Sequence, residues 1–350
     1  MKGEVMKAKK LFNPAGDDSL ETRRIIGGNS TNIFNLNNVR YQWANRMYRN
    51  MMANFWIPEK TDLSSDLEPY KHLTVEERQA YDGILSFLIF LDSIQTNNLS
   101  NINDFITAPE VNLLIAIQQY QEAIHSQSYQ YTVESIIPAD RRNSIYDKWR
   151  SDKVLFERNK YIAQIYQDFI DEPSQEHFYR ALIANYLLEG LYFYNGFNFF
   201  YNLASRHLML GTSEIIRYIN RDELTHCVLF ELIVREIREL EPEFFPAAEV
   251  ETMFRTAVEQ EIGWTRHIIG DGILGISEET TELYTKWLAN ERWNKLGFGG
   301  KLYEGYDKNP YLHLERLADT EGEGSVKSNF FESTVSAYNQ SSVLDGWDDF

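Results

Sequence analysis

Hydrophobic positions along most of this chain recur with the spacing of helices. A helical pattern runs from about Tyr41 to Trp56 and stops before Pro58. Thr74 followed by Glu77 forms a capping box, which predicts the start of a second, longer helix. Further helical segments are predicted at about 110–135, 143–170, 174–204, 212–240, 247–270 and 278–295. Segments of this length, with few alternating runs between them, indicate an all-α protein.

The two ends of the chain differ in composition from this helical body. Residues 1–35 are polar and rich in glycine and asparagine, which predicts an irregular arm before a helical domain at 36–316. Residues 317–350 are acidic and rich in glycine and serine, yet aromatic residues such as Tyr338 and Trp347 punctuate them. Since plain disordered segments are depleted in aromatic residues, we expect a flexible tail that docks on another protein. A frayed terminus is the alternative.

Composition restricts the classes of partner and compartment. The formal net charge is −18, with 52 acidic against 34 basic residues, which argues against nucleic acid or an anionic membrane as the main partner. We find no secretory signal and no apolar run long enough to span a bilayer, so we expect a cytoplasmic protein. The single cysteine, Cys227, cannot form an intramolecular disulfide. A reaction that needs a dithiol must therefore find it on a partner.

Two Glu-x-x-His pairs suggest a metal site. They are Glu122 with His125 and Glu223 with His226, and no other histidine among the seven follows a glutamate at this spacing. Residues three apart lie on one face of a helix, so each pair can present a carboxylate and an imidazole together. In ferritin-like dimetal proteins, two helices carry this motif and two others supply one carboxylate each.

Two lone acids could supply the missing carboxylates. Asp92 interrupts the apolar stretch "LSFLIFLDSIQ", and Glu189 interrupts "ALIANYLLEGLYFYNGFNFF". A surface charge or a satisfied ion pair explains either acid alone, because an unpaired buried charge is costly. The six residues together favour a dimetal core inside a ferritin-like helical bundle with flanking helices. Four carboxylates and two imidazoles suit iron or manganese.

A tyrosine lies beside the predicted metal ligands. Tyr129 follows His125 by four residues, so its phenol should approach the metals. Phe193 and Phe197 follow Glu189 on the same helical stripe and should exclude water. An oxidising centre beside a dry phenol is arranged for one-electron oxidation of that phenol. Without the metal, Tyr129 would be interpreted as an ordinary core residue among 21 tyrosines.

The ligand segments resemble those of a known family. "LDSIQ", "EAIHSQSY", "LLEGLYFY" and "RDELTH" resemble the four ligand segments of the class I ribonucleotide reductase small, radical-generating subunit. "ANFWIPEKTDLSSD" resembles the early helix end of that family, and the likeness covers about residues 40–305 and the tail. The resemblance implies a radical at Tyr129 and two metal ions, bound by Asp92, Glu122, His125, Glu189, Glu223 and His226.

The same resemblance implies a path out of the subunit. Trp56 and Asp222 match residues that pass the oxidising equivalent outward, with His125 linking them to the metals. Tyr338 matches a tail tyrosine that relays to the large (alpha) subunit, and the terminal "LDGWDDF" resembles the anchoring peptide. We therefore expect a homodimer that works with the large subunit to reduce ribonucleotides to deoxyribonucleotides. Iron with a tyrosyl radical is the default, and a manganese-containing centre that stores the equivalent on the metals stays open.

Three other functions remain to be weighed. A ferritin-like oxidase acting directly on a lipid or hydrocarbon would need an apolar substrate channel and no relay tail, so Trp56, Asp222 and Tyr338 count against it. Iron-storage chains are usually much shorter and lack such a tail. A purely structural bundle would be excluded by finding two metal ions in each chain.

Overall fold

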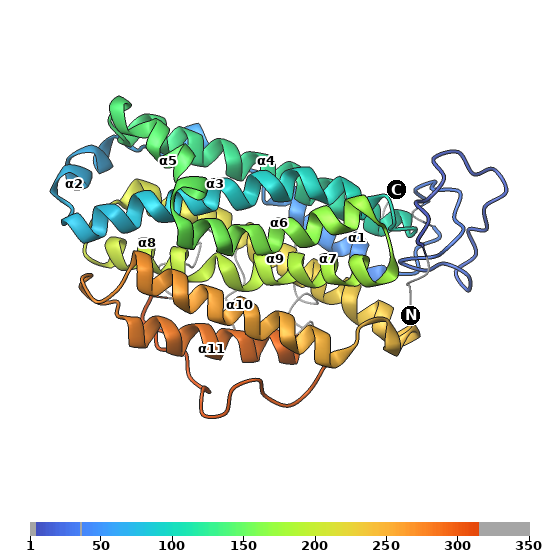
Figure 1. Ribbon diagram of the computed structural model, residues 1–350. Helices are drawn as coiled ribbons and strands as arrows, with labels where there is room; N and C mark the ends of the chain where they lie inside the picture. Colours follow the sequence, from blue (N-terminus) through green and yellow to red (C-terminus); the bar gives the residue numbers. More distant parts are fainter. Residues whose placement is uncertain (1–4, 36, 315–350) are drawn as a thin grey trace.

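The computed structural model describes residues 5–35 and 37–314, and within these ranges the chain forms helices and isolated bridges but no strand. The predicted all-α fold is therefore confirmed. Long helices lie side by side along the molecule (Figure 1). The central ones contact one another in a four-helix arrangement: α3 (Val75–Asn103), α4 (Pro109–Ile136), α7 (Gln175–Leu187) and α9 (Leu210–Leu240).

Further helices surround this core. α10 packs against α11 on one side, and α1 packs against α4 on another (Figure 1). The flanking helices are α1 (Gln42–Ala53), α2 (Leu67–His72), α5 (Ala139–Ser151), α6 (Lys153–Asp171), α8 (Tyr194–Ser205), α10 (Ala247–Ile268) and α11 (Glu278–Lys295). The 3₁₀ turns are η1 (Pro58–Lys60), η2 (Ser64–Asp66) and η4 (Pro242–Phe244).

Local capping explains where several helices begin and end. The predicted capping box is present, since Thr74 Oγ1 accepts the Glu77 N–H at 3.1 Å and Glu77 Oε2 accepts the Thr74 N–H at 3.0 Å. The single helix predicted at 143–170 is wrong, because α5 and α6 are separated at Asp152. The Asp152 carboxylate accepts the first N–H groups of α6 and restarts the helix there. The first predicted helix also ends early, so Trp56 lies in the connection after α1.

The helix predicted at 174–204 is interrupted where the metal ligand was expected. α7 passes into a π-helical segment, η3 (Leu188–Tyr192), which carries Glu189, and α8 follows it. A π-segment inserts extra backbone into a helix, so the residues after it project from a different face. Hydrophobic periodicity averages over such an insertion, which explains why the sequence pattern indicated one continuous helix.

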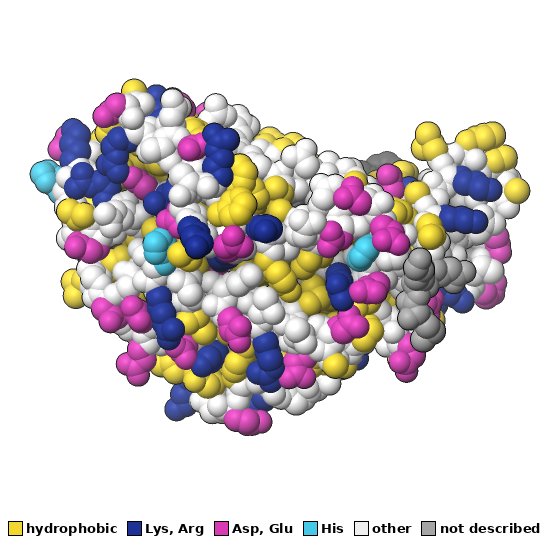
Figure 2. All heavy atoms as spheres, in the orientation of Figure 1, with side chains coloured by type: hydrophobic (Ala, Val, Ile, Leu, Met, Phe, Trp, Pro, Cys, Tyr) yellow, Lys and Arg dark blue, Asp and Glu magenta, His cyan; other side chains and the backbone are white. Residues whose placement is uncertain are grey.

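Residues 5–35 form a lobe without helices that projects beyond the end of the bundle (Figure 1). Isolated bridges attach it to the bundle, one from Val5 to Ser174 and one from Ile26 to Ile106. Acidic and basic side chains are interspersed over the visible face (Figure 2). No helix in the part of the chain that the structure describes is both long and apolar enough to cross a bilayer. The predicted tail at 317–350, including Tyr338, lies outside the described residues.

Candidate metal centre

The structure brings all six predicted ligands into one buried cluster between the central helices. Each of the six side chains is completely buried. They form two overlapping groups, and within each group all the ligand atoms lie within 4.8 Å of one another. Subsite A consists of Asp92 (α3), Glu122 and His125 (α4) and Glu223 (α9). Subsite B consists of Glu122, Glu189 (η3), Glu223 and His226 (α9).

Two of the carboxylates lie between the two imidazoles. Glu122 places Oε2 at 3.5 Å from His125 Nδ1 and Oε1 at 3.1 Å from His226 Nδ1. Glu223 places Oε1 at 2.9 Å from His125 Nδ1 and Oε2 at 2.9 Å from His226 Nδ1. Each of these two carboxylates thus offers one oxygen to each subsite, so each could contribute a ligand atom to both metal positions. Asp92 and Glu189 belong to one subsite each.

Outer hydrogen-bond partners orient both imidazoles. His125 Nε2 lies 3.3 Å from Asp222 Oδ2, and His226 Nε2 lies 3.0 Å from Gln121 Oε1. Because these outer oxygens can only accept hydrogen bonds, they hold the Nε2–H group of each ring and leave Nδ1 facing the carboxylates. Both histidines are therefore prepared to bind a metal through Nδ1.

The electrostatics of the cluster fit two divalent cations. Burial, followed by the charges of Glu122 and Glu223, raises the pKa of Asp92 well above its usual value. Burial lowers the pKa of His125, but Glu223 and Asp222 outweigh that effect and raise it overall. Among the described residues, several buried atoms find no hydrogen-bond partner outside this cluster and Tyr129: both oxygens of Asp92, Glu122 Oε2, His125 Nδ1, Glu189 Oε2 and Glu223 Oε1. Metal coordination would satisfy these otherwise costly atoms, so the residues fit a dimetal centre.

Tyr129 is buried beside this cluster. Its side chain is 1% exposed, and its hydroxyl lies beside the Asp92 carboxylate. Burial, followed by the charges of Asp92 and Glu223, raises the pKa of Tyr129 well above its usual value. The phenol therefore keeps its proton at neutral pH.

The phenylalanines predicted near the centre are also buried. Phe193, at the junction of η3 and α8, and Phe197, in α8, stack with ring centroids 5.7 Å apart. Phe87 of α3 lies next to Phe193, at a centroid distance of 6.3 Å. These rings leave little room for water on the side of the bundle that they fill.

Trp56 and Asp222 meet at a position that links them to subsite A. Trp56 Nε1–H donates to Asp222 Oδ2 at 2.8 Å, and the same oxygen faces His125 Nε2. Arg221 donates to the other oxygen of Asp222. Trp56 is 9% exposed and stacks on Tyr218 at a centroid distance of 5.3 Å. A continuous hydrogen-bonded path therefore runs from the His125 imidazole of subsite A to the Trp56 indole.

Sequence reasoning missed the amide groups around Glu189. Gln118 Nε2 donates to Glu189 Oε1 at 2.7 Å, and Gln95 Nε2 donates to the same oxygen and to Asn185 Oδ1. Gln118 precedes Glu122 by four residues and Gln95 follows Asp92 by three, so helical spacing alone places both on the ligand faces. That spacing is a signal from which both residues could have been found.

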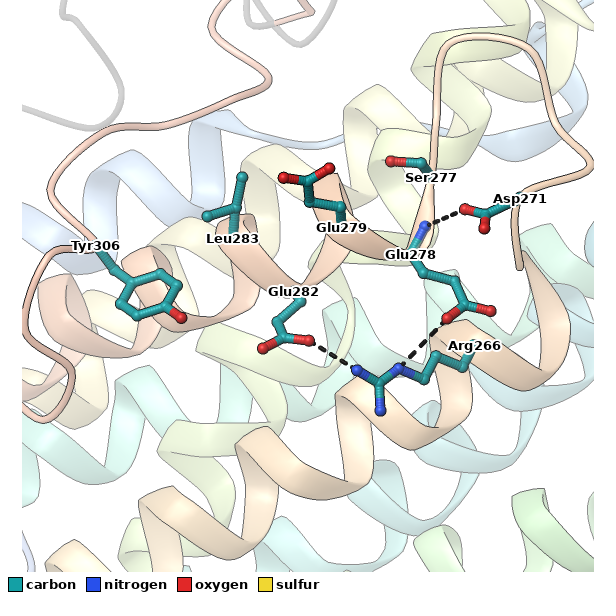
Figure 3. A pocket seen from close by; sticks show the side chains of 8 residues that line it. All are labelled: Arg266, Asp271, Ser277, Glu278, Glu279, Glu282, Leu283 and Tyr306. Atoms are coloured by element: carbon teal, nitrogen blue, oxygen red, sulfur yellow. Dashed lines mark hydrogen bonds and ion pairs between the residues drawn. The ribbon is translucent and has the colours of Figure 1, made fainter.

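A surface hollow between α10 and α11 is a separate feature (Figure 3). Its volume is about 520 Å³, and charged side chains line it. Arg266 pairs with Glu278 and Glu282, and Asp271 accepts a backbone N–H from Glu278 (Figure 3). These groups satisfy one another and lie on the outer helices α10 and α11 or in the turn between them, so the hollow has no part in the buried cluster.

Comparison with known proteins identifies the family. The profile described as "Ribonucleotide reductase, small chain" matches residues 33–310. The chain belongs to the ribonucleotide reductase small-chain family. A relative named ribonucleoside-diphosphate reductase subunit beta, from Treponema pallidum (strain Nichols), is 45% identical over 343 residues, which cover 97% of each chain.

Solved structures agree with this assignment. A ribonucleotide reductase R2 subunit from Clostridium botulinum matches with a TM-score of 0.88 and 44% identity, covering 91% of this chain and 100% of that one. A putative class I ribonucleotide reductase from Bacillus halodurans matches with a TM-score of 0.82 and 37% identity, covering 88% and 98%. The resemblance inferred from the ligand segments is thereby confirmed, and the chain is a ribonucleotide reductase small subunit. This result argues against iron storage or direct oxidation of an apolar substrate.

Proposed function

We propose that this small subunit holds two metal ions, uses them to oxidise Tyr129, and exports the oxidising equivalent to the large subunit. The observation that carries the proposal is the convergence of four acids and two imidazoles in a dry interior, with two carboxylates shared between subsites. Bound there, two redox-active ions would supply the oxidising equivalent after reacting with oxygen or a reduced oxygen species. We propose iron as the native metal, and manganese is the other outcome of the test below.

Tyr129 is the residue that we propose to store the equivalent. Its pKa is raised, so the phenol is protonated and must lose one electron and its proton together to become a neutral radical. The nearby carboxylate cluster can receive that proton. Because the Tyr129 side chain is buried, water and external reductants reach the site with difficulty. Burial of this kind would extend the lifetime of the radical.

Trp56, Asp222 and His125 form the proposed exit path. Oxidation of the Trp56 indole becomes easier when its Nε1 proton moves to a base, and Asp222 Oδ2 already accepts that hydrogen bond. The contact between Asp222 and His125 joins the indole to subsite A. We propose that Tyr338 continues the path to the large subunit from the tail, and that "LDGWDDF" anchors the tail there.

The reduction itself is proposed to occur on the large subunit. Reducing a ribonucleotide requires thiols, and this chain has one buried cysteine, Cys227. The relatives are named ribonucleoside-diphosphate reductases, so we propose ribonucleoside diphosphates as substrates of the complete enzyme. We also propose that the small subunit is a homodimer. Deletion of 318–350 should remove binding to the large subunit and leave metal binding intact, and retained binding would exclude the tail as the anchor.

Metal analysis combined with electron paramagnetic resonance tests the proposal. Protein purified from its native host should contain two metal ions per chain and show a sharp phenoxyl-type signal. The analysis would identify iron or manganese directly. Two bound ions without an organic radical would favour storage of the equivalent on the metals. Fewer than two ions per chain, even after reconstitution, would contradict the dimetal centre.

A further inference from the structure

The two oxygens of Glu189 lie in different environments. Oε1 accepts hydrogen bonds from Gln118 Nε2, at 2.7 Å, and from Gln95 Nε2. Oε2 has no hydrogen-bond partner outside the ligand cluster within the described residues, and it lies 3.5 Å from His226 Nδ1, on the side of subsite B. One oxygen is therefore occupied by amide donors, and the other is directed at the metal position.

The Gln95 amide has a defined orientation. Tyr166 O–H donates to Gln95 Oε1 at 3.0 Å, so the nitrogen end of the amide must face Glu189 and Asn185. Gln95, Gln118 and Asn185 are completely buried, and Tyr166 is 3% exposed. Water does not compete for these donors, and hydrogen bonds from an amide to a buried carboxylate are strong.

The backbone that carries Glu189 is restrained as well. Arg292 Nε–H donates to the carbonyl of Gly190 at 2.9 Å, and Arg158 donates through Nη2 to the carbonyl of Tyr192 at 3.0 Å. Both carbonyls belong to the π-helical segment η3. The segment therefore cannot easily shift to carry the carboxylate with it.

The corresponding acid of subsite A is not held in this way. Within the described residues no amide donates to either oxygen of Asp92, which faces only the Tyr129 hydroxyl and His125 Nδ1. The two subsites thus differ in how freely the carboxylate that belongs to one subsite alone, Asp92 or Glu189, can rearrange. The identities of the ligands do not show this difference, because each subsite has three carboxylates and one histidine.

We propose that Gln95 and Gln118 are positioning residues that hold Oε1 of Glu189, so that Glu189 offers only Oε2 to the ion in subsite B. The proposal rests on the dimetal function proposed above. Replacing Gln95 by leucine keeps the side-chain volume and removes the donor. Changes to residues that position metal ligands typically lower affinity about 10–100-fold, and the loss should be confined to subsite B.

The experiment uses the full-length protein, freed of metal, with Mn²⁺ alone as the probe. Titration followed by paramagnetic resonance measures the two affinities, and anomalous diffraction from crystals at limiting Mn²⁺ measures the occupancy of each subsite. Gln95→Leu is the cleaner variant, because Gln118 also lies 3.4 Å from the bridging residue Glu122. We expect roughly tenfold or greater weakening at subsite B, unchanged affinity at subsite A, and Glu189 turned to present both oxygens.

Control variants separate positioning from a general structural effect. Gln119→Leu removes an amide that bonds to the Thr96 carbonyl and should change neither subsite. Tyr166→Phe removes the hydroxyl that orients Gln95 and should weaken subsite B to a smaller extent, which keeps the test available if Gln95→Leu does not fold.

The outcomes distinguish this inference from the proposed function. Equal weakening of both subsites, no weakening, or Glu189 still bound through Oε2 alone in Gln95→Leu would overturn the positioning role. Failure of the unaltered protein to bind two Mn²⁺ ions would instead contradict the dimetal centre.

Discussion

A buried ion pair next to the π-helical segment η3 offers a quantitative test of the structure. Arg158 of α6 and Glu261 of α10 form a salt bridge with side chains that are each 2% exposed. The Arg158 guanidinium also lies 3.5 Å from the ring centroid of Phe87 and bonds to the Tyr192 carbonyl in η3. Asn195 donates to Glu261 at 3.1 Å. The pair thus joins two outer helices to the segment that carries a predicted ligand.

Replacing Arg158 by methionine should destabilise the protein strongly at neutral pH. The variant leaves the Glu261 carboxylate buried without a cation, and breaking a buried pair in this way costs about 3–5 kcal/mol. Burial already raises the pKa of Glu261 in the native protein, and Arg158 opposes that effect. Without Arg158, the folded-state pKa should rise further above the unfolded value of about 4.3.

The sign of the pH dependence follows from that shift. A carboxyl group whose pKa is raised by folding binds more protons in the folded state, so the free energy of unfolding falls as pH rises toward the folded pKa. At about 1.36 kcal/mol per pH unit, the variant should lose up to about 2.7 kcal/mol relative to the native protein between pH 5.5 and 7.5. Its destabilisation should therefore be smallest in acid.

Urea unfolding of the metal-free protein, followed by far-ultraviolet circular dichroism at pH 5.5 and 7.5, measures these quantities. Protein concentration must be constant, because association contributes to apparent stability. The double variant Arg158→Met/Glu261→Leu should recover most of the loss, since apolar replacement of a buried pair is often nearly neutral. Arg150→Met, which removes an exposed pair with Asp147, is the control and should have little effect. A cost below about 1 kcal/mol, or one independent of pH, would refute the reasoning.

Three further predictions concern the radical and its surroundings. Tyr129→Phe should abolish the phenoxyl signal while two metals stay bound, and an unchanged signal would place the radical elsewhere. Gly190→Ala should lower the free energy of unfolding by about 1–3 kcal/mol, because a Cβ there would lie 2.9 Å from Cys227 Sγ. Gly263→Ala is the matched control and should not destabilise, because no described side chain lies within 4 Å of a Cβ at that position. Tyr338→Phe should preserve metal content and large-subunit binding but stop nucleotide reduction, so turnover by this variant would exclude a relay role.

The six residues that cluster in the structure could be predicted from the sequence because each part of their signal is local. Glu122 with His125, and Glu223 with His226, share a helix face whatever the tertiary fold. Asp92 and Glu189 stood out because an isolated acid in an apolar helix requires compensation. The resemblance to the family added Trp56 and Asp222, which helical spacing could not connect.

The interruptions of the predicted helices depended on finer features. Asp152 ends one helix and begins another through a side-chain bond, and η3 inserts extra backbone around Glu189. Hydrophobic periodicity responds to an average over several turns, so neither the restart nor the π-segment altered it enough to be detected.

The sequence by itself therefore determined the helical class and the side chains of the candidate centre, since both arise from local patterns along single helices. Only the tertiary structure decided which carboxylates lie between the subsites, that Gln95 and Gln118 hold one oxygen of Glu189, and that Arg158 pairs with Glu261. These contacts join residues 71 to 103 positions apart. Such pairings depend on how helices pack against one another, and the spacing of residues along a single helix does not predict them.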